Sequence, residues 1–292
     1  MNDFEGTSTP LERQFENVLE RNPQSRSILQ AFEPILQETL RLADEIVCKE
    51  IDLSAIDKVR LQGGIPVIEQ TALLLPEDPW YQIARAMIPA IIRGFPALGR
   101  ELLILQKGID DGTIRLADFY GAKNGQEIAD GWAKALAVRR EVLDFLLRTA
   151  AKPVLEKRRR AIKELLEASG WDKGYCPCCG AFPAVAVIHE KIPQRWLHCS
   201  QCGYDWRFSR VVCPYCSHES QQEMPYFFVE GKEQETAFVC EKCKRYLITI
   251  NHISNLETHD PDVLAMGMTY LDLLMQQKGF MPMTVSPWNV FD

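Results

Sequence analysis

The stretch that decides the fold holds four CxxC pairs, which read C-P-C-C at 176–179, C-S-Q-C at 199–202, C-P-Y-C at 213–216 and C-E-K-C at 240–243. Nineteen residues separate the first pair from the second, and 23 separate the third from the fourth. Only 10 residues lie between the second pair and the third. Pairing the motifs in sequence order therefore gives two similar units, each a hairpin-sized stretch between two CxxC turns. The spacing predicts an internal duplication with one four-cysteine site in each unit.

Two facing CxxC turns supply four thiolates, the ligand set of a closed tetrahedral metal site with metal–sulfur distances of about 2.3 Å. Gly180 and Gly203 directly follow their pairs, where a left-handed residue often closes such a turn. Thiolate tetrahedra suit zinc or iron, and the residues alone leave both metals open. Because four cysteines leave no open coordination position, we do not expect hydrolytic metal chemistry. The predicted ligands are Cys176, Cys179, Cys199, Cys202, Cys213, Cys216, Cys240 and Cys243.

The two remaining cysteines and two histidines have less specific interpretations. Cys178 lies inside the first turn and could replace Cys179 as a ligand, but the CxC spacing is the rarer geometry, so we expect a spare thiol. Cys48 lies on a predicted amphipathic helix and is expected in the core. His198 and His218 are adjacent to the sites. Since four thiolates already fill each tetrahedron, we expect these histidines near the metals but not bound to them.

Composition and charge limit the possible partners. The chain has 292 residues, 46% of them apolar, and a net charge of −7. Residues 171–255 carry nine Lys or Arg and nine Asp or Glu, and two divalent tetrathiolate sites would add about −4 to that balance. A nucleic-acid-binding zinc ribbon normally has a basic surface, so nucleic acid is disfavoured. The N-terminus shows no basic and apolar export signal, and no apolar run is long enough for a membrane span. We therefore expect a cytoplasmic protein, in which reducing conditions favour metal over disulfides.

Hydrophobic periodicity separates a helical first part from a region of short strands. Helices are predicted at 25–49, 78–92, 96–107, 125–151, 153–169 and 263–277, with Asp78 and Asp260 as N-caps. Short β-branched and aromatic segments after Trp171 are typical of hairpins. The predicted fold class is α+β, an N-terminal all-α domain followed by two tetracysteine modules and a C-terminal helix. The expected boundaries are 1–170, 171–210, 211–256 and 257–292.

The whole pattern resembles the FdhE family. The resemblance rests on a helical half followed by C-P-C-C-G at 176–180, C-S-Q-C-G-Y at 199–204, C-P-Y-C at 213–216, C-E-K-C at 240–243 and H-D-P-D at 259–262. It implies two rubredoxin-like modules that each bind one iron ion. It also implies an accessory protein, not itself an enzyme, that is needed for active respiratory formate dehydrogenase. Such a protein would contact the catalytic subunit in the cytoplasm before that subunit is exported.

Two alternative functions remain open at this point. The iron–tetrathiolate centres could pass single electrons to the same enzyme, or, against the charge balance, the modules could be nucleic-acid-binding zinc ribbons. Exposed aromatics and arginines are the usual anchors of protein interfaces. The candidates that follow a CxxC turn directly are Tyr204, Trp206, Arg207, Arg245 and Tyr246, and we predict them as partner contacts. The sequence leaves the oligomeric state undetermined.

Overall fold

The structure, a computed structural model, describes residues 11–189, 194–253 and 260–289. Its chain divides into two compact units. The sheet unit takes in the described residues within 1–29, 58–66 and 166–292, and the helical unit consists of 30–57 and 67–165. Within the described ranges, no helix combines the length and the apolar sequence that a membrane crossing needs.

The helices of the helical unit are α2 (Arg26–Glu45, whose first residues belong to the sheet unit), α4 (Trp80–Gly94), α5 (Gly99–Asp110), α6 (Leu116–Gly121), α7 (Gly125–Leu136) and α8 (Arg140–Ala161). In this unit, α4 packs against α5, α6 and α8, and α7 packs against α5, α6 and α8. The ring of Phe95 meets those of Phe32 and Phe145 edge-on, at centroid distances of 5.1 and 5.4 Å. Gly94 lets α4 approach α2 closely, because a Cβ there would lie 1.8 Å from the carbonyl oxygen of Ala31. Short 3-10 turns occur at Leu53–Ala55, Val67–Glu69 and Pro96–Leu98.

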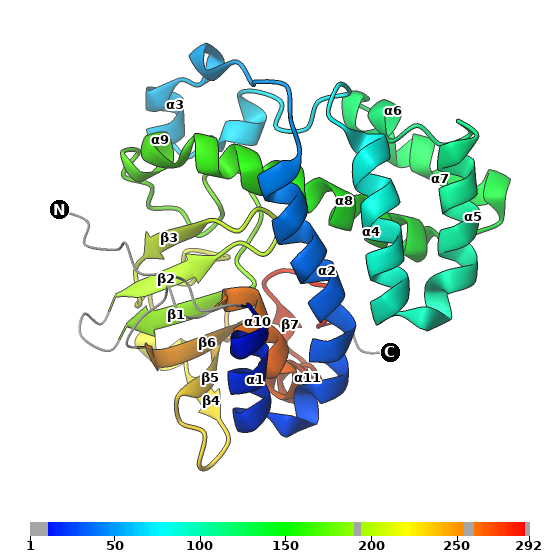
Figure 1. The fold of residues 1–292 in the computed structure, drawn as a ribbon. Coiled ribbons are helices and arrows are strands. Elements are labelled where there is room, and N and C mark those ends of the chain that lie inside the picture. The colour runs from blue at the N-terminus through cyan, green and yellow to red at the C-terminus, as the bar shows by residue number, and fades with distance from the viewer. Residues whose placement is uncertain (1–10, 190–193, 254–259, 290–292) are drawn as a thin grey trace. The chain divides into compact units, whose positions relative to one another are not determined.

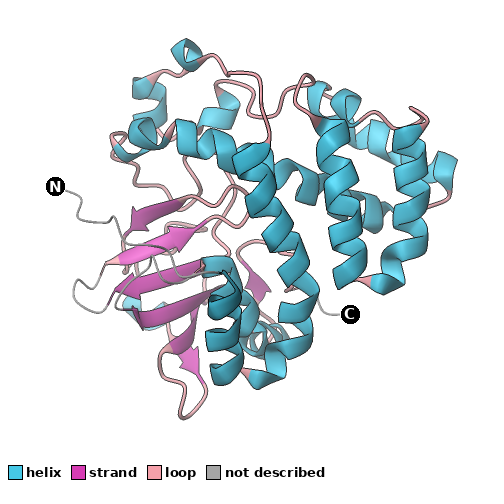
Figure 2. Ribbon diagram, viewed as in Figure 1, coloured by secondary structure: helices cyan, strands magenta, loops and turns pink. Residues whose placement is uncertain are grey.

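The sheet unit is organised around one seven-stranded sheet with the order β3-β2-β1-β6-β5-β4, and β7 also pairs with β6 (Figures 1 and 2). Its strands are β1 (Val185–His189), β2 (Arg195–His198), β3 (Asp205–Phe208), β4 (Tyr226–Phe228), β5 (Glu235–Cys240), β6 (Arg245–Ile253) and β7 (Met281–Pro282). The strands β1 to β3 form one antiparallel set and β4 to β6 another. Parallel pairing of β1 with β6, with Val185 opposite Ile248 and Val187 opposite Ile250, joins the two sets. The two predicted metal modules therefore share a single sheet.

Helices from both ends of the chain complete the sheet unit. They are α1 (Leu11–Arg21), α3 (Lys58–Gln62), α10 (Pro261–Gly267) and α11 (Thr269–Gln277), with 3-10 turns at Pro23–Ser25 and Gln221–Glu223; α9 (Lys163–Glu167) lies where the chain passes between the units. α1 packs on α10, which in turn packs on β1. The Ser25 hydroxyl donates to the carbonyl of Gly267 at 2.8 Å, and the Asn22 side-chain amide donates to Glu235 at 2.8 Å. The first helix is thus part of the sheet unit, although the sequence suggests one continuous helical domain up to residue 170.

The predicted α+β class is confirmed, with helices in the N-terminal region and two tetracysteine groups in the C-terminal part. Asp260 caps α10 as predicted, since its carboxylate accepts from the N–H groups of Asp262 and Val263. His259, which belongs to the family resemblance, lies outside the described residues. The segment Asp205–Phe208 forms the strand β3, although two of its residues, Trp206 and Arg207, are predicted as partner contacts.

Three helix predictions were wrong in their limits. The helix expected over 125–151 ends at Leu136, because Ala137 takes a left-handed conformation with φ 52°. The helix expected from 153 instead begins at Arg140 and continues through Pro153 to Ala161. Buried side chains on both sides of Pro153, such as Leu147 and Val154, continue the packed face of this helix, and that packing outweighs the missing hydrogen bond. The expected helix 263–277 is divided at Met268.

The residue Asp78 was also misassigned as a helix cap. Its carboxylate accepts from the Leu75 N–H at 2.8 Å and forms a two-point ion pair with Arg158, at 2.5 and 2.8 Å. The Arg158 side chain is only 4% exposed, so this arginine of the basic run 157–160 is buried in the unit. Arg158 also donates to the carbonyl of Lys49 at 3.0 Å.

Candidate metal centres

All four CxxC pairs form the same tight turn. The residue after the second cysteine has a positive φ each time, 74° at Gly180, 71° at Gly203, 57° at Ser217 and 56° at Lys244. Its N–H donates to the carbonyl of the first cysteine of the turn at 2.8 to 3.0 Å. Glycine adopts this conformation freely, whereas Ser217 and Lys244 accept it at a cost of about 1 kcal/mol. The repeated turn places each pair of sulfurs on one side of its loop.

The first centre gathers Cys176, Cys179, Cys199 and Cys202, and the second gathers Cys213, Cys216, Cys240 and Cys243. Within each group all sulfurs lie within 4.8 Å of one another. In the first centre, the Cys176–Cys202 sulfurs are 3.6 Å apart and the Cys179–Cys199 sulfurs 3.4 Å. In the second, the Cys213–Cys243 distance is 3.8 Å and the Cys216–Cys240 distance 3.7 Å.

These separations fit a metal ion. Four sulfurs bound tetrahedrally at about 2.3 Å from one ion are about 3.8 Å apart, close to the distances found in both groups. The first centre is the more enclosed, since only Cys179 among its four cysteines is partly exposed. In the second, Cys216 and Cys243 are partly exposed. Each group can therefore hold one metal ion, and the donor set suits iron or zinc equally.

Backbone donors surround the sulfurs of the second centre. The N–H groups of Tyr215 and Cys216 donate to Cys213, although burial is the larger effect and raises the pKa of Cys213 to about 12. The His218 N–H donates to Cys216 and the Arg245 N–H to Cys243. Such N–H groups spread thiolate charge and orient the ligands. These N–H groups stabilise the thiolate form that a metal requires, against the opposing effect of burial.

The first centre already favours one thiolate. Hydrogen bonds from the thiols of Cys176, Cys178 and Cys179 lower the pKa of Cys202 to about 6. Burial raises the pKa of Cys176 well above its usual value, so this thiol has to lose its proton when metal binds. Cys178 is fully buried and lies within hydrogen-bonding reach of Cys202. The extra thiol therefore contacts the centre, while the tetrahedral group consists of the four cysteines predicted from spacing.

The two nearby histidines face carboxylates. His198 is buried, with Nδ1 2.7 Å from Asp205 and Nε2 3.4 Å from Asp262. The carboxylates hold the pKa of His198 well above its usual value even though burial opposes this. His218 forms a short contact with Glu223. Both imidazoles thus have partners other than a metal. Asp205 and Glu223 lie seven and five residues from their histidines, whereas Asp262 comes from a distant segment that the local sequence does not indicate.

A close contact joins the two centres. Gly174 precedes the first CxxC turn and lies against Pro214 of the third, where an added Cβ would meet the Pro214 carbonyl oxygen at 1.9 Å. The ring of Phe182 lies 4.7 Å from that of Tyr215, between centroids. The Arg245 guanidinium lies over the Tyr215 ring, 4.0 Å from the ring centroid. The first and third turns therefore pack directly against each other.

Most residues predicted as partner contacts are internal. Tyr204, Trp206 and Tyr246 are 7%, 3% and 1% exposed, so their rings are packed inside the sheet unit and do not form surface anchors. The Trp206 indole donates to the Lys173 carbonyl at 3.0 Å. Arg245 is half-buried over Tyr215, and Arg207 is exposed, with its guanidinium 5.0 Å from the Trp196 ring centroid. A contact role for these two arginines stays a prediction.

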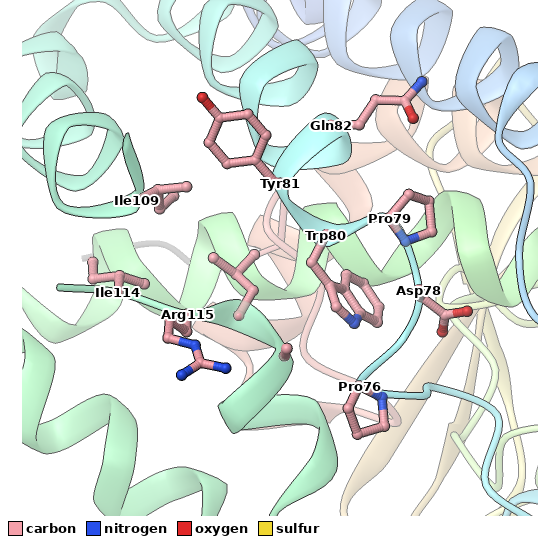
Figure 3. Close-up of a pocket in the computed structure, with 11 residues that line it drawn as sticks. Pro76, Asp78, Pro79, Trp80, Tyr81, Gln82, Ile109, Ile114 and Arg115 are labelled. Carbon is pink, nitrogen blue, oxygen red and sulfur yellow. The ribbon is translucent and has the colours of Figure 1, made fainter. Parts of the chain in front are cut away.

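The helical unit has a hollow of about 460 Å³ at the start of α4 (Figure 3). Trp80 and Ile114 are among its lining side chains. Two of the polar side chains there, Trp80 and Asp78, are already used within the unit. The Trp80 indole donates to the Leu75 carbonyl at 2.7 Å, and Asp78 pairs with Arg158. This hollow therefore has no converging set of polar groups of the kind that fixes a small-molecule ligand.

The sequence of the first centre matches a known family. Residues 175–210 match the family model described as "FdhE, central domain". The Protein FdhE homolog of Aquifex aeolicus is 29% identical over 143 residues, which cover 48% of this chain and 50% of that protein. Protein FdhE of Salmonella choleraesuis is 29% identical over 126 residues, 41% of this chain and 38% of that protein. The chain thus spans about half the length, or less, of the curated relatives it matches.

A solved structure shares the fold. The crystal structure of the FdhE protein from Pseudomonas aeruginosa superposes with a TM-score of 0.61, covering 92% of this chain and 91% of that one at 18% identity. The tetracysteine segment, the similar sequences and the common fold together support a likeness to the FdhE family.

Proposed function

We propose that this protein is an accessory factor for the maturation and activity of respiratory formate dehydrogenase, and that it binds the catalytic subunit of that enzyme in the cytoplasm before export. The observation that carries the proposal is the FdhE family's cysteine array, with two four-sulfur groups in the geometry of closed metal sites. A metal with four thiolate ligands has no position for a substrate. The protein would then act on its partner by binding, and would not itself be an enzyme.

We propose one iron ion in each centre, with zinc as the alternative metal. The eight paired cysteines would hold the ions, and an iron centre would supply reversible one-electron chemistry. Deprotonation of the buried thiols would accompany metal uptake. In either case the metal joins two loops that are distant in sequence, so it also contributes to folding of the sheet unit.

A binding experiment with the purified catalytic subunit tests the main proposal. Metal-loaded protein is immobilised, and the dissociation constant for the catalytic subunit is measured by interferometry with an unrelated exported enzyme as control. Specific binding is expected. A deletion strain should also lose formate dehydrogenase activity and regain it with the wild-type gene. Absence of binding together with full activity in the deletion strain would rule the proposal out.

A second candidate function is one-electron transfer to the same enzyme. The N–H groups that donate to Cys213, Cys216 and Cys243 favour it, because hydrogen bonds to the sulfurs are a main determinant of reduction potential in iron–thiolate centres. Anaerobically prepared protein would then show a thiolate-to-iron absorption band that disappears and returns on reduction and reoxidation. Colourless protein with two zinc ions per chain would exclude this function while leaving the accessory role intact.

A further inference from the structure

The side chain of Arg195 is enclosed within the sheet unit. Arg195 is the first residue of β2 and is 0% exposed. Its guanidinium carbon lies 5.2 Å from the ring centroid of Phe208 and 5.1 Å from that of Phe238. Contacts of a cation with aromatic rings recover part of the solvation that a buried guanidinium loses. The positive charge is thus held in a fixed place away from water.

This charge has no ionic partner in the part of the chain that the structure describes. Nη2 of Arg195 donates to the Val212 carbonyl at 2.6 Å and also to the Ser209 carbonyl. Nε and Nη1 have no hydrogen-bond partner, and no described carboxylate forms an ion pair with the guanidinium. Taking a charge out of water is costly, so a buried guanidinium is normally paired with an anion. An anion that balances Arg195 therefore has to be sought nearby.

Arg195 contacts both ligand segments of the second centre. Val212, whose carbonyl accepts from Arg195, directly precedes Cys213. Phe238 lies two residues before Cys240 on β5, so the two side chains share one face of that strand. The guanidinium thus touches a residue next to one ligand turn and a residue on the ligand-bearing face of the strand that leads into the other. The nearby anion that this placement indicates is the metal–thiolate group itself.

The charge of an occupied centre depends on the valence of the ion. Four thiolates leave a net charge of about −2 around a divalent ion and about −1 around a trivalent ion. Burial lowers the pKa of Arg195 to about 10, and the charges of Tyr226 and Cys213 oppose this shift, so the guanidinium stays charged at neutral pH. Charges interact strongly in a poorly polarisable interior. A fixed positive charge therefore stabilises the −2 state more than the −1 state.

We propose that Arg195 is the fixed counter-charge of the second metal centre, and that its guanidinium favours a divalent over a trivalent ion there. With iron as the metal, this preference raises the reduction potential of the centre, since net charge is one of the determinants of that potential. Arg195 itself gives up no electron and takes up no proton. It is a positioning residue that changes only the relative free energies of two charge states. The inference rests on the proposed function in one respect, since it requires a metal ion in the second centre.

A matched pair of variants of the full-length protein, loaded with iron under anaerobic conditions, tests this role. Arg195→Met removes the charge, and Arg195→Lys keeps it in an unbranched side chain of similar length. The midpoint potential of each centre is measured by spectroelectrochemical titration, and Cys216→Ser, which lacks a ligand of the second centre, identifies the signal of the first. At a given potential, Arg195→Met should lower the ratio of reduced to oxidised second centre about tenfold, a shift of about 59 mV. Arg195→Lys should keep this ratio within about twofold of wild type.

Zinc gives a second measurement that needs no redox chemistry. In chelator competition, Arg195→Met should weaken zinc binding by the second centre about tenfold and leave the first centre unchanged. Arg195→Gln, which keeps an amide donor for the Val212 carbonyl, is the alternative neutral variant if Arg195→Met does not fold. Arg13→Met is the control, because it removes an exposed charge of α1 that solvent screens. It should leave both potentials and both zinc affinities within about twofold of wild type.

The outcomes separate a role of the charge from a role in packing. If neutral and charged variants keep the wild-type potential and zinc affinity, the inference is overturned while the proposed function stands. It is also overturned if Arg195→Lys is impaired as much as Arg195→Met, or if zinc binding weakens while the potential stays unchanged, because Arg195 then acts through packing alone. If the wild type binds no metal in the second centre, the proposed metal content fails and the inference fails with it. Binding of the catalytic subunit is measured separately and is not decided by these results.

Discussion

The contact between Gly174 and Pro214 gives a quantitative test of the link between the two centres. In Gly174→Ala, the new Cβ would lie 1.9 Å from the Pro214 oxygen and 2.4 Å from its carbonyl carbon, although real Cβ contacts below 3.0 Å are essentially never seen. Both contacts are with backbone, so Pro214 has to move by about 1 Å. Metal sites tolerate changes of only about 0.2 Å in their ligand distances. Pro214 lies between Cys213 and Cys216, and the shift therefore displaces two ligands of the second centre.

We expect Gly174→Ala to lower the free energy of unfolding by about 3 kcal/mol, the upper end for overpacking, and to reduce the metal content below two ions per chain. Metal content by mass spectrometry and denaturant unfolding monitored by circular dichroism measure the two effects. Gly131→Ala is the matched control, because nothing lies within 4 Å of a Cβ added there in α7. It should keep both metals and gain up to about 1 kcal/mol from helix propensity. A Gly174→Ala protein with two metal ions and wild-type unfolding would refute the reasoning.

Three further predictions concern the cysteines and the buried ion pair. Cys216→Ser should lose one metal ion per chain, whereas Cys178→Ala should keep both in anaerobic metal analysis; loss of an ion from Cys178→Ala would show that the first turn uses a CxC pair. Metal binding displaces the proton of Cys213, whose pKa without metal is about 12. The affinity of the second centre for metal should therefore rise at least about tenfold per pH unit near neutrality, which chelator competition measures. A metal affinity that does not change with pH would contradict a protonated Cys213 thiol in the metal-free protein. Arg158→Met, which leaves the Asp78 carboxylate buried, should destabilise the helical unit by about 3–5 kcal/mol in urea unfolding. The exposed Arg100→Met should have no comparable effect.

The cysteine spacing predicted the candidate sites well because ligand pairing is local. A CxxC turn closes within five residues, so its geometry depends on short-range backbone chemistry, and Gly180 and Gly203 signal it directly. Ser217 and Lys244 adopt the same left-handed conformation without being glycine, which residue type alone does not indicate. The cysteine positions in sequence predicted both four-sulfur groups, whereas the contact of Cys178 with Cys202 depends on three-dimensional packing.

Most of the errors involve packing or backbone conformation that local sequence patterns do not record. Asp78 resembles a helix cap by its position before Pro79, but Arg158, 80 residues away in sequence, takes its carboxylate. Trp206 and Tyr246 resemble surface anchors because each follows a CxxC turn, yet sheet pairing turns them inward. Hydrophobic periodicity likewise continues through Ala137, where the backbone reverses. No local pattern predicts that β1 and β6 are neighbours.

The pairing of β1 with β6 also affects how the protein is made. During synthesis β1 emerges more than 50 residues before its central neighbour, since β1 ends at His189 and β6 begins at Arg245. α1 packs against α10, and this contact can form only after α10 has also been synthesised. Contacts so distant in sequence slow folding and leave apolar strand edges temporarily exposed. The three strands β1 to β3 and the first group of four cysteines are complete by Phe208, so this set can take up metal while the other half of the sheet is still being translated. We expect early metal uptake there to protect the unfinished sheet from aggregation, and iron- or zinc-starved cells to accumulate aggregated protein.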